Sequence, residues 1–238
     1  MRRVVRGAWG PREESVETLA GRWKLTLERL TGLLPTVVSG PGEVGTWRHI
    51  RESEPFINFQ PDEASLRGVL RDTREADGWT DRTGTRLTLA SAGETGWNAE
   101  LRGRGGGTSE FLLQTMMIAI ESPDDAEIPD VELLTVLAEV WAPDFGDVSN
   151  DDVLDALEDE GGFGPDEPSV GWVGYLSPGR AALVPDGMTA PRKELGVGGI
   201  LLEIAPYGNI ESVLQANLRL RDSGALQPLP RPMERTAL

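Results

Sequence analysis

Cysteine is absent from the 238-residue sequence, and histidine occurs only once, at position 49. Without cysteine the chain forms no disulfide, offers no thiol nucleophile and cannot bind zinc through thiolates. A single histidine leaves few routes to a catalytic triad or a zinc site, since zinc usually needs several imidazoles. His49 lies in a polar stretch, residues 47–51, and we expect it at the surface.

Long apolar runs are also missing. The longest near-apolar stretches, residues 111–120 and 197–204, are about half as long as the ~20 residues that a membrane-spanning helix needs. Residues 1–7 carry charge but lack the apolar segment of a secretory signal. We therefore expect a cytoplasmic protein without membrane contact. Hydrophobic residues make up 39% of the chain and charged residues 26%, which is typical of a globular protein.

Positive charge is scarce in the second half of the chain. Residues 1–120 contain 16 Lys and Arg and 16 Asp and Glu, whereas residues 121–238 contain 7 and 23, so the net charge of −16 lies entirely in the second half. Residues 121–167 hold 17 acidic residues and no Lys or Arg. Such a field repels nucleic acid and anionic membranes and attracts basic protein surfaces. The run could also serve solubility alone, so charge does not choose between a partner-binding face and a solvated one.

Apolar periodicity and helix-start signals predict the helices. They are expected over residues 11–34, 61–76, 129–141 and 209–221. Pro11 suits the first turn of the first of these helices. Ser149 or Asn150 can cap a further short, acidic helix, in which Val153 and Leu157 are apolar.

Short apolar segments separated by glycine predict the strands. They are expected over residues 86–90, 96–102, 109–120, 170–177 and 198–205. Residues 109–120 are apolar on both faces, which favours a central position in the sheet. The fold class is thus α+β, a mainly antiparallel sheet with helices packed on it, forming one domain over residues 1–226.

Three further segments are expected to be irregular. Residues 35–55 are rich in Gly, Pro and Ser and indicate a loop. The glycine-rich run at 103–107 lacks the Lys-Ser/Thr pair of a phosphate-binding loop and joins two strands, so we expect a flexible hairpin loop. Residues 227–238, with three prolines, are expected to form a flexible tail.

The densest part of the acidic run is the candidate partner-binding site. Its members are Asp144, Asp147, Asp151, Asp152, Asp155, Glu158, Asp159 and Glu160. Hydrolysis by paired carboxylates could use Asp144 with Asp147, or Asp151 with Asp155. In so acidic a segment, however, such spacings arise by chance, and no calcium-loop pattern is present. We therefore predict no enzymatic activity, no cofactor and no metal.

Four tryptophan-containing motifs occur in a fixed order along the chain. They are Trp9-Gly10-Pro11 with the Arg12 to Ser15 segment, Gly96-Trp97-Asn98, Trp141-Ala142-Pro143-Asp144, and Gly171-Trp172 with the Val173 to Ser177 segment that contains Tyr175. Over residues 8 to 226 the chain resembles immunity protein family 52 of bacterial polymorphic toxin systems. The resemblance implies an α+β protein that neutralises a cognate toxin, in this family often a nuclease.

The acidic run and the resemblance lead to one functional hypothesis. A nuclease presents basic residues to the phosphate backbone, so an inhibitor with dense carboxylates can occupy that surface. The motif tryptophans are expected in the core and not at the toxin contact. Two alternatives stay open: a small carboxylate-dependent hydrolase, and an acidic adaptor unrelated to toxins. The adaptor predicts a neighbouring gene that encodes no toxin.

Overall fold

The computed structural model describes residues 1–238 apart from 35–46, 51–56, 77, 93–95 and 165. In the described residues one antiparallel sheet has the order β3-β2-β4-β5-β6-β1-β7-β8-β10-β9. Its strands are β1 (Arg2–Trp9), β2 (Trp47–His49), β3 (Ile57–Phe59), β4 (Thr85–Ala92), β5 (Asn98–Gly105), β6 (Gln114–Glu121), β7 (Phe145–Ser149), β8 (Val173–Leu176), β9 (Arg192–Glu194) and β10 (Ile200–Glu203). The helices are α1 (Val16–Thr31), α2 (Glu63–Glu75), α3 (Asp130–Trp141), α4 (Asp151–Asp159), α5 (Pro178–Ala181) and α6 (Ile210–Asp222). The predicted α+β fold with an antiparallel sheet is confirmed.

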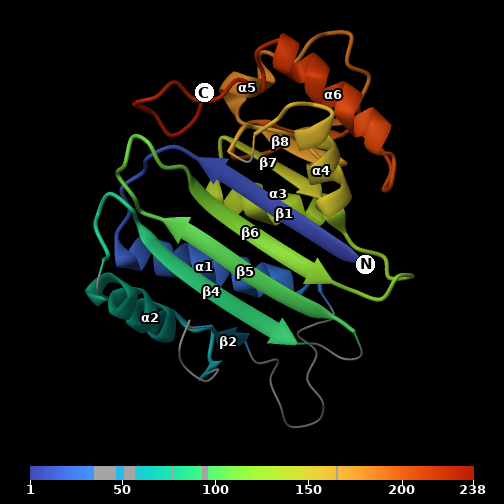
Figure 1. The fold of residues 1–238 in the computed structure, drawn as a ribbon. Coiled ribbons are helices and arrows are strands. Elements are labelled where there is room, and N and C mark those ends of the chain that lie inside the picture. Colours follow the sequence, from blue (N-terminus) through green and yellow to red (C-terminus); the bar gives the residue numbers. More distant parts are fainter. Residues whose placement is uncertain (35–46, 51–56, 77, 93–95, 165) are drawn as a thin grey trace.

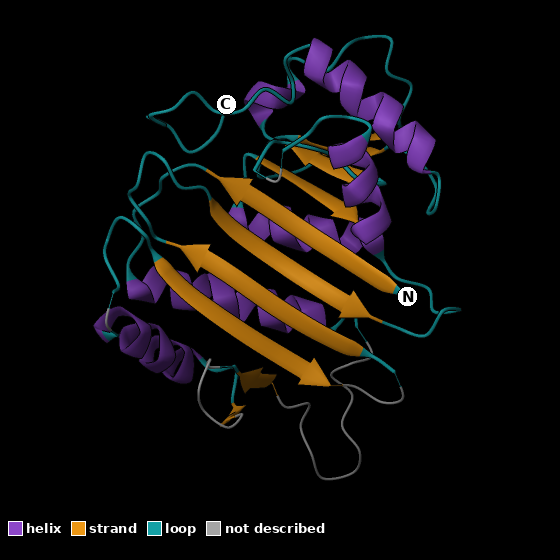
Figure 2. Cartoon of the chain, viewed as in Figure 1, coloured by secondary structure: helices purple, strands orange, loops and turns teal. Residues whose placement is uncertain are grey.

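The helices cover the two faces of the sheet unequally. Figure 1 shows α1 and α3 behind the sheet, with α2 beside α1, whereas α4 and α6 lie on the near side over β7 and β8. Two hydrophobic cores result, one between the sheet and α1 to α3 and one beneath α4 and α6. Figure 2 shows no helix over the near face of β4, β5 and β6 within the described chain. These strands are therefore buried on one face only.

Strand β6 shows this one-sided burial directly. Its central position is confirmed, because it lies between β5 and β1. Met116, Ile118 and Ile120 are buried, while the residues between them are less so. The strand begins at Gln114 and not at residue 109, and Phe111, expected within it, is 50% exposed. The apolar pattern thus located the strand but overstated how much of it is covered.

The first helix begins later than its apolar pattern predicts. Ser15 caps α1, because its Oγ accepts a hydrogen bond from the Thr18 amide at 3.1 Å. Pro11 therefore lies in the connection from β1, outside the helix. The apolar face itself is confirmed, since Leu19, Trp23 and other residues of the pattern are buried.

We predict that Ser15→Ala lowers the free energy of unfolding by about 1 kcal/mol, because an amide of the first turn loses its acceptor. Urea denaturation followed by circular dichroism measures the change. Ser15→Asp keeps an acceptor and should keep wild-type stability. Equal stability of the alanine variant and the wild type would show that the cap contributes nothing.

The other predicted helices are confirmed with shifts of one or two residues at their ends, as α2, α3 and α6. The short acidic helix is α4, and Asn150 is the residue that caps it, accepting from the Val153 amide at 3.0 Å. Asp62 and Asn209 cap α2 and α6 in the same way. These boundaries are local features, so the sequence predicts them well.

The other four predicted strands correspond to β4, β5, β8 and β10, whereas β1, β2, β3, β7 and β9 were not anticipated. The glycine run at 103–107 is not a flexible hairpin loop, because β5 extends to Gly105. A Cβ at Gly103 would lie 2.6 Å from Cζ2 of Trp23, and one at Gly107 would lie 2.5 Å from Nε2 of Gln114. The glycines therefore allow close approach of neighbouring side chains.

His49 is not a surface residue. It lies in β2, is 8% exposed and faces Leu89 of β4 in the register. Leu89 is buried, so its register partner His49 lies on the core side of the sheet, which the polar sequence around it does not reveal. The predicted loop at 35–55 is wrong at residues 47–49, which form β2, and most of the rest of it lies outside the described residues.

The C-terminal residues 227–238 are not a frayed tail. Leu229 and Met233 are buried, and the Met233 amide donates to the Glu110 carbonyl at 2.8 Å. The Gly10 amide donates to the Thr236 carbonyl at 2.7 Å. Proline prevents regular structure here, but backbone hydrogen bonds to distant residues hold the segment against the domain.

Candidate partner-binding surface

The acidic run divides into buried and exposed residues. Asp144 is fully buried, and its carboxylate pairs with the equally buried Arg180 at 2.6 Å. Ser177 Oγ and the Leu238 amide also donate to Asp144, at 3.0 and 2.8 Å. The expectation that Asp144 belongs to an exposed acidic face is wrong, because the residue neutralises a buried guanidinium.

Asp147 is likewise internal. It lies in β7, all of whose residues are buried, because this strand runs between β1 and β8. Its carboxylate accepts from Nε of Arg6 and, at 2.7 Å, from Oγ of Ser149. Asp147 is 1% exposed and also cannot form part of the predicted surface.

The remaining six acidic residues lie on or beside α4 and are exposed. Asp151 forms an ion pair with Arg2. The other five have no cationic partner within the described chain, and we call them the α4 acidic surface: Asp152, Asp155, Glu158, Asp159 and Glu160. Val153 and Leu157 bury the opposite side of the helix in the core shared with α6. The carboxylates therefore lie on a helix whose opposite side is packed against the core.

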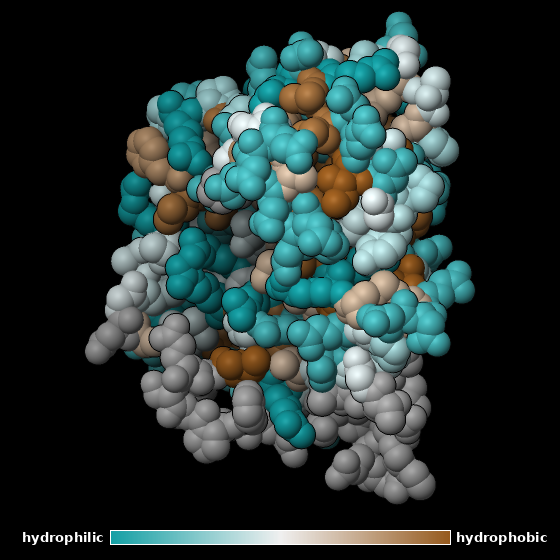
Figure 3. All heavy atoms as spheres, turned by 45° about the vertical axis from the view of Figure 1, so that its right-hand side comes forward, coloured by the Kyte–Doolittle hydropathy of each residue, from teal (hydrophilic) through white to brown (hydrophobic). Residues whose placement is uncertain are grey.

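The acids at the C-terminal end of α4 do not stabilise the helix, unlike Asp151 and Asp152, which lie in its first turn, where the dipole favours negative charge. Glu158, Asp159 and Glu160 lie at its C-terminal end, where the helix dipole disfavours negative charge, and its last turn contains no basic residue. Figure 3, which brings the α4 side of the molecule forward, shows mostly hydrophilic side chains interrupted by small hydrophobic areas. Since these acids do not stabilise the helix, their position is explained by a function outside it, either solubility or the binding of a partner.

The two carboxylate pairs considered for catalysis lie in different surroundings. Asp144 and Asp147 are each held by an arginine, and Asp151 and Asp155 lie on the exposed side of α4. Among the described residues, no group of three or more His, Asp or Glu side chains is placed to hold a metal ion. None of the helices in that part of the chain has the length and apolar character needed to cross a membrane.

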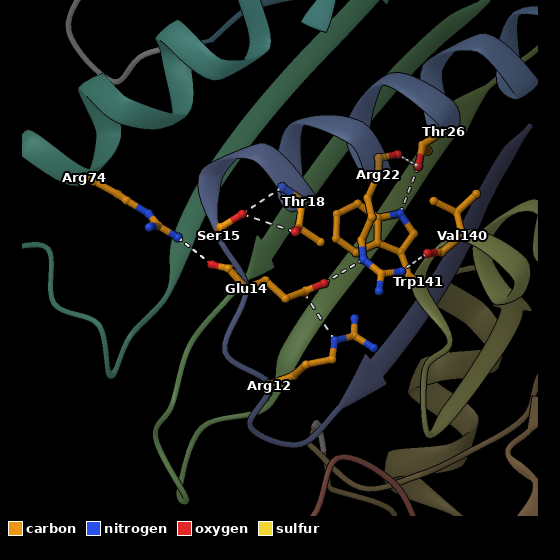
Figure 4. A network of polar contacts seen from close by, with 9 residues as sticks. All are labelled: Arg12, Glu14, Ser15, Thr18, Arg22, Thr26, Arg74, Val140 and Trp141. Carbon is orange, nitrogen blue, oxygen red and sulfur yellow. Dashed lines mark hydrogen bonds and ion pairs between the residues drawn. The ribbon is translucent and has the colours of Figure 1, made fainter.

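The tryptophans of the first and third motifs meet in the core (Figure 4 shows Trp141). Trp9 stacks on Trp141 with ring centroids 5.6 Å apart, and Trp23 meets Trp141 edge-on at 5.8 Å. Nε1 of Trp141 donates to Oγ1 of Thr26 at 2.9 Å. This cluster joins β1, α1 and α3, so its rings are structural, as expected.

A polar network surrounds the cluster at the start of α1 (Figure 4). The Glu14 carboxylate accepts from Nε of Arg22 at 2.7 Å and from Nε of Arg12 at 3.2 Å. Arg74 of α2 donates to the Glu14 carbonyl at 2.9 Å. Burial lowers the pKa of Arg12, and the Glu14 carboxylate opposes that shift. The charged residues of the first motif thus link α1 to α2 and the sheet.

Comparison with known proteins does not assign a family or a function to this chain. No family model and no curated protein matches the chain. The resemblance of the tryptophan motifs to an immunity family therefore stays a prediction.

Several glycines and prolines of the motifs lie where the chain passes close to itself. A Cβ at Gly10 would lie 2.3 Å from the Arg235 carbonyl oxygen, and one at Gly171 would lie 1.8 Å from that of Val148. Only glycine fits at either position without a shift of the backbone. The Pro11 carbonyl accepts from Thr236 at 3.1 Å, and Pro143 is buried.

The aromatic residues of the remaining motifs differ in burial. Trp172 is buried, with its ring 4.7 Å from that of Tyr207. Tyr175 donates to the Gly198 carbonyl at 3.1 Å, and burial, with a smaller effect of the Asp144 charge, raises the pKa of Tyr175 to about 12. Trp97 is only partly buried at the edge of the core, and the neighbouring Asn98 is exposed.

A basic surface on the open face of the sheet was missed by the sequence reasoning. Six arginines point from this face: Arg2, Arg6, Arg48, Arg86, Arg102 and Arg104. Four of them line a pocket of about 760 Å³ over β4, β5 and β6. Strand alternation could have revealed part of this surface, because Arg86 lies on the face opposite Leu87 and Leu89. An overall charge of −16 concealed it.

Proposed function

We propose that this chain is an immunity protein that binds and neutralises a cognate toxin, acting in the cytoplasm by binding and not by catalysis. The main support is the α4 acidic surface: five exposed carboxylates on a well-packed helix that have no cationic partner in the part of the chain that the structure describes. The motif resemblance supports the same class of function. A nuclease is the toxin type that fits best, because its nucleic-acid site must be basic.

Electrostatic steering explains what such a surface can contribute. Like-signed charges on one rigid face raise the rate at which a basic partner is captured, roughly 10- to 1,000-fold at low salt. For a toxin that kills its own producer, fast capture matters as much as final affinity. The surviving site is smaller than predicted, because Asp144 and Asp147 are internal and Asp151 is paired with Arg2.

The test uses the product of the adjacent gene as the candidate toxin. One variant neutralises the α4 acidic surface through D152N, D155N, E158Q, D159N and E160Q. A matched control removes five exposed carboxylates elsewhere through E13Q, D81N, D125N, E127Q and E194Q. Association rates are measured by biolayer interferometry over a range of salt concentrations, and protection is measured by co-expression in growing cells.

We expect the α4 variant to associate at least about tenfold more slowly at low salt and to show a flatter salt dependence. The control should behave like the wild type. Equal loss in both variants would mean that net charge and not α4 directs binding. A neighbouring product that is not toxic, or does not bind the wild-type chain, would favour the adaptor alternative.

A further inference from the structure

Two arginines on the open face of the sheet repel each other. Arg86 of β4 and Arg104 of β5 are direct partners in the antiparallel register. Within the described residues neither guanidinium has an ion-pair or hydrogen-bond partner. Like charges directly opposite in a sheet are destabilising, so this pair costs stability in the isolated chain.

The other two arginines that line the same pocket are neutralised. Arg6 pairs with Asp147, and Arg102 pairs with Glu100. Arg104 differs from them because it is partly buried and forms no ion pair with a carboxylate of the described residues, and this burial, followed by the charge of Arg86, lowers the pKa of Arg104. Among the described residues, this adjacent pair of cations is therefore uncompensated, and an anion between them would relieve the repulsion.

Arg86 and Arg104 line a pocket whose other walls are apolar, hydroxyl-bearing and acidic. Its volume of about 760 Å³ lies in the range of small-molecule sites, roughly 300–1,000 Å³. Leu113 and Met117 give it an apolar wall, and Thr115, the register partner of Arg104, adds a hydroxyl. Asp166 and Glu167 line it from the segment before β8 and offer acceptors for hydrogen-bond donors. A ligand with an anionic end, an apolar body and donor groups matches this arrangement.

We propose that this pocket binds a phosphorylated small molecule of nucleotide size, with its phosphate between Arg86 and Arg104 and its organic part against Met117 and Leu113. Arginine suits this role because its planar guanidinium binds phosphate through two parallel hydrogen bonds. The site lies over β4 to β6 and uses no residue of α4. It therefore stands or falls separately from toxin binding.

Isothermal titration calorimetry on the full chain tests the proposal with AMP, UMP, ribose 5-phosphate and inorganic phosphate. The R86Q/R104Q variant is compared with R67Q/R71Q on α2, which removes the same charge from the other side of the sheet. We expect at least one organic phosphate to bind the wild type more tightly than inorganic phosphate does. Its affinity should fall at least about tenfold in R86Q/R104Q and stay unchanged in the control.

Thermal unfolding without ligand provides a second measurement. Because the substitutions remove a repulsion, R86Q/R104Q should melt at or above the wild-type temperature, and AMP should stabilise only the wild type. Three results would overturn the proposal: no organic phosphate binds the wild type, the variant binds as tightly, or inorganic phosphate binds as tightly as its esters. Binding of a ten-nucleotide single strand without binding of any mononucleotide would also overturn it, in favour of a nucleic-acid surface.

Discussion

Replacing Asp144 with asparagine is expected to lower the free energy of unfolding by about 3–5 kcal/mol, because it leaves the charge of Arg180 buried and unpaired. Both side chains are completely buried, and their ion pair is 2.6 Å long. Asparagine keeps the size of the side chain, so the loss measures charge and hydrogen bonding more than volume. Urea denaturation monitored by circular dichroism gives the value.

Asp152→Asn is the matched control, since Asp152 lies in the same acidic run but is exposed and has no cationic partner among the described residues. We expect its stability to stay within about 0.5 kcal/mol of the wild type. If both variants lost the same stability, general charge effects would explain the result. A loss below about 1 kcal/mol in Asp144→Asn would contradict the buried ion pair.

Trp141→Ala is expected to lower the free energy of unfolding by about 3–5 kcal/mol, because it opens a cavity between α1, α3 and β1. The substitution removes two aromatic contacts, with Trp9 and Trp23, and leaves the buried hydroxyl of Thr26 without its donor. Chemical denaturation followed by far-ultraviolet circular dichroism measures this loss independently of tryptophan fluorescence.

Trp141→Phe separates the ring contacts from the hydrogen bond. Phenylalanine keeps an aromatic ring but cannot donate to Thr26, so we expect a smaller loss than in the alanine variant, about 1–3 kcal/mol. Trp97→Ala provides a comparison with a tryptophan that is only partly buried. A smaller loss for Trp141→Ala than for Trp97→Ala would contradict the central position of Trp141.

Local sequence patterns were enough for the described helices other than α5 and for several strands. The apolar spacing of α1 places Leu19, Trp23 and Leu27 on one buried face, and Asn150 marks the start of α4 through its side-chain acceptor. Both features depend on residues within one or two helical turns. The start of α1 was misplaced because Pro11 and Ser15 are both acceptable there, and only the connection from β1 excludes the proline.

The candidate site was predictable only in part. The sequence groups Asp144 and Asp147 with the α4 acidic surface, because they share its charge and are near it in the chain. In the fold they enter the interior, where Arg180 and Arg6 from distant segments neutralise them. A carboxylate in a sequence does not reveal whether a distant arginine will meet it. Exposure of the α4 carboxylates follows from their place on a surface helix.

The sequence by itself determined the fold class, most helices and the segments that form β4, β5, β6, β8 and β10, since propensity, capping and periodicity act between near neighbours in the chain. Only the tertiary structure decided which acids are buried, that residues 227–238 lie against the domain, and that Arg86 and Arg104 face each other on an open sheet. These features depend on strand order and register. Both arise from contacts between residues far apart in the sequence, where a local pattern carries no information.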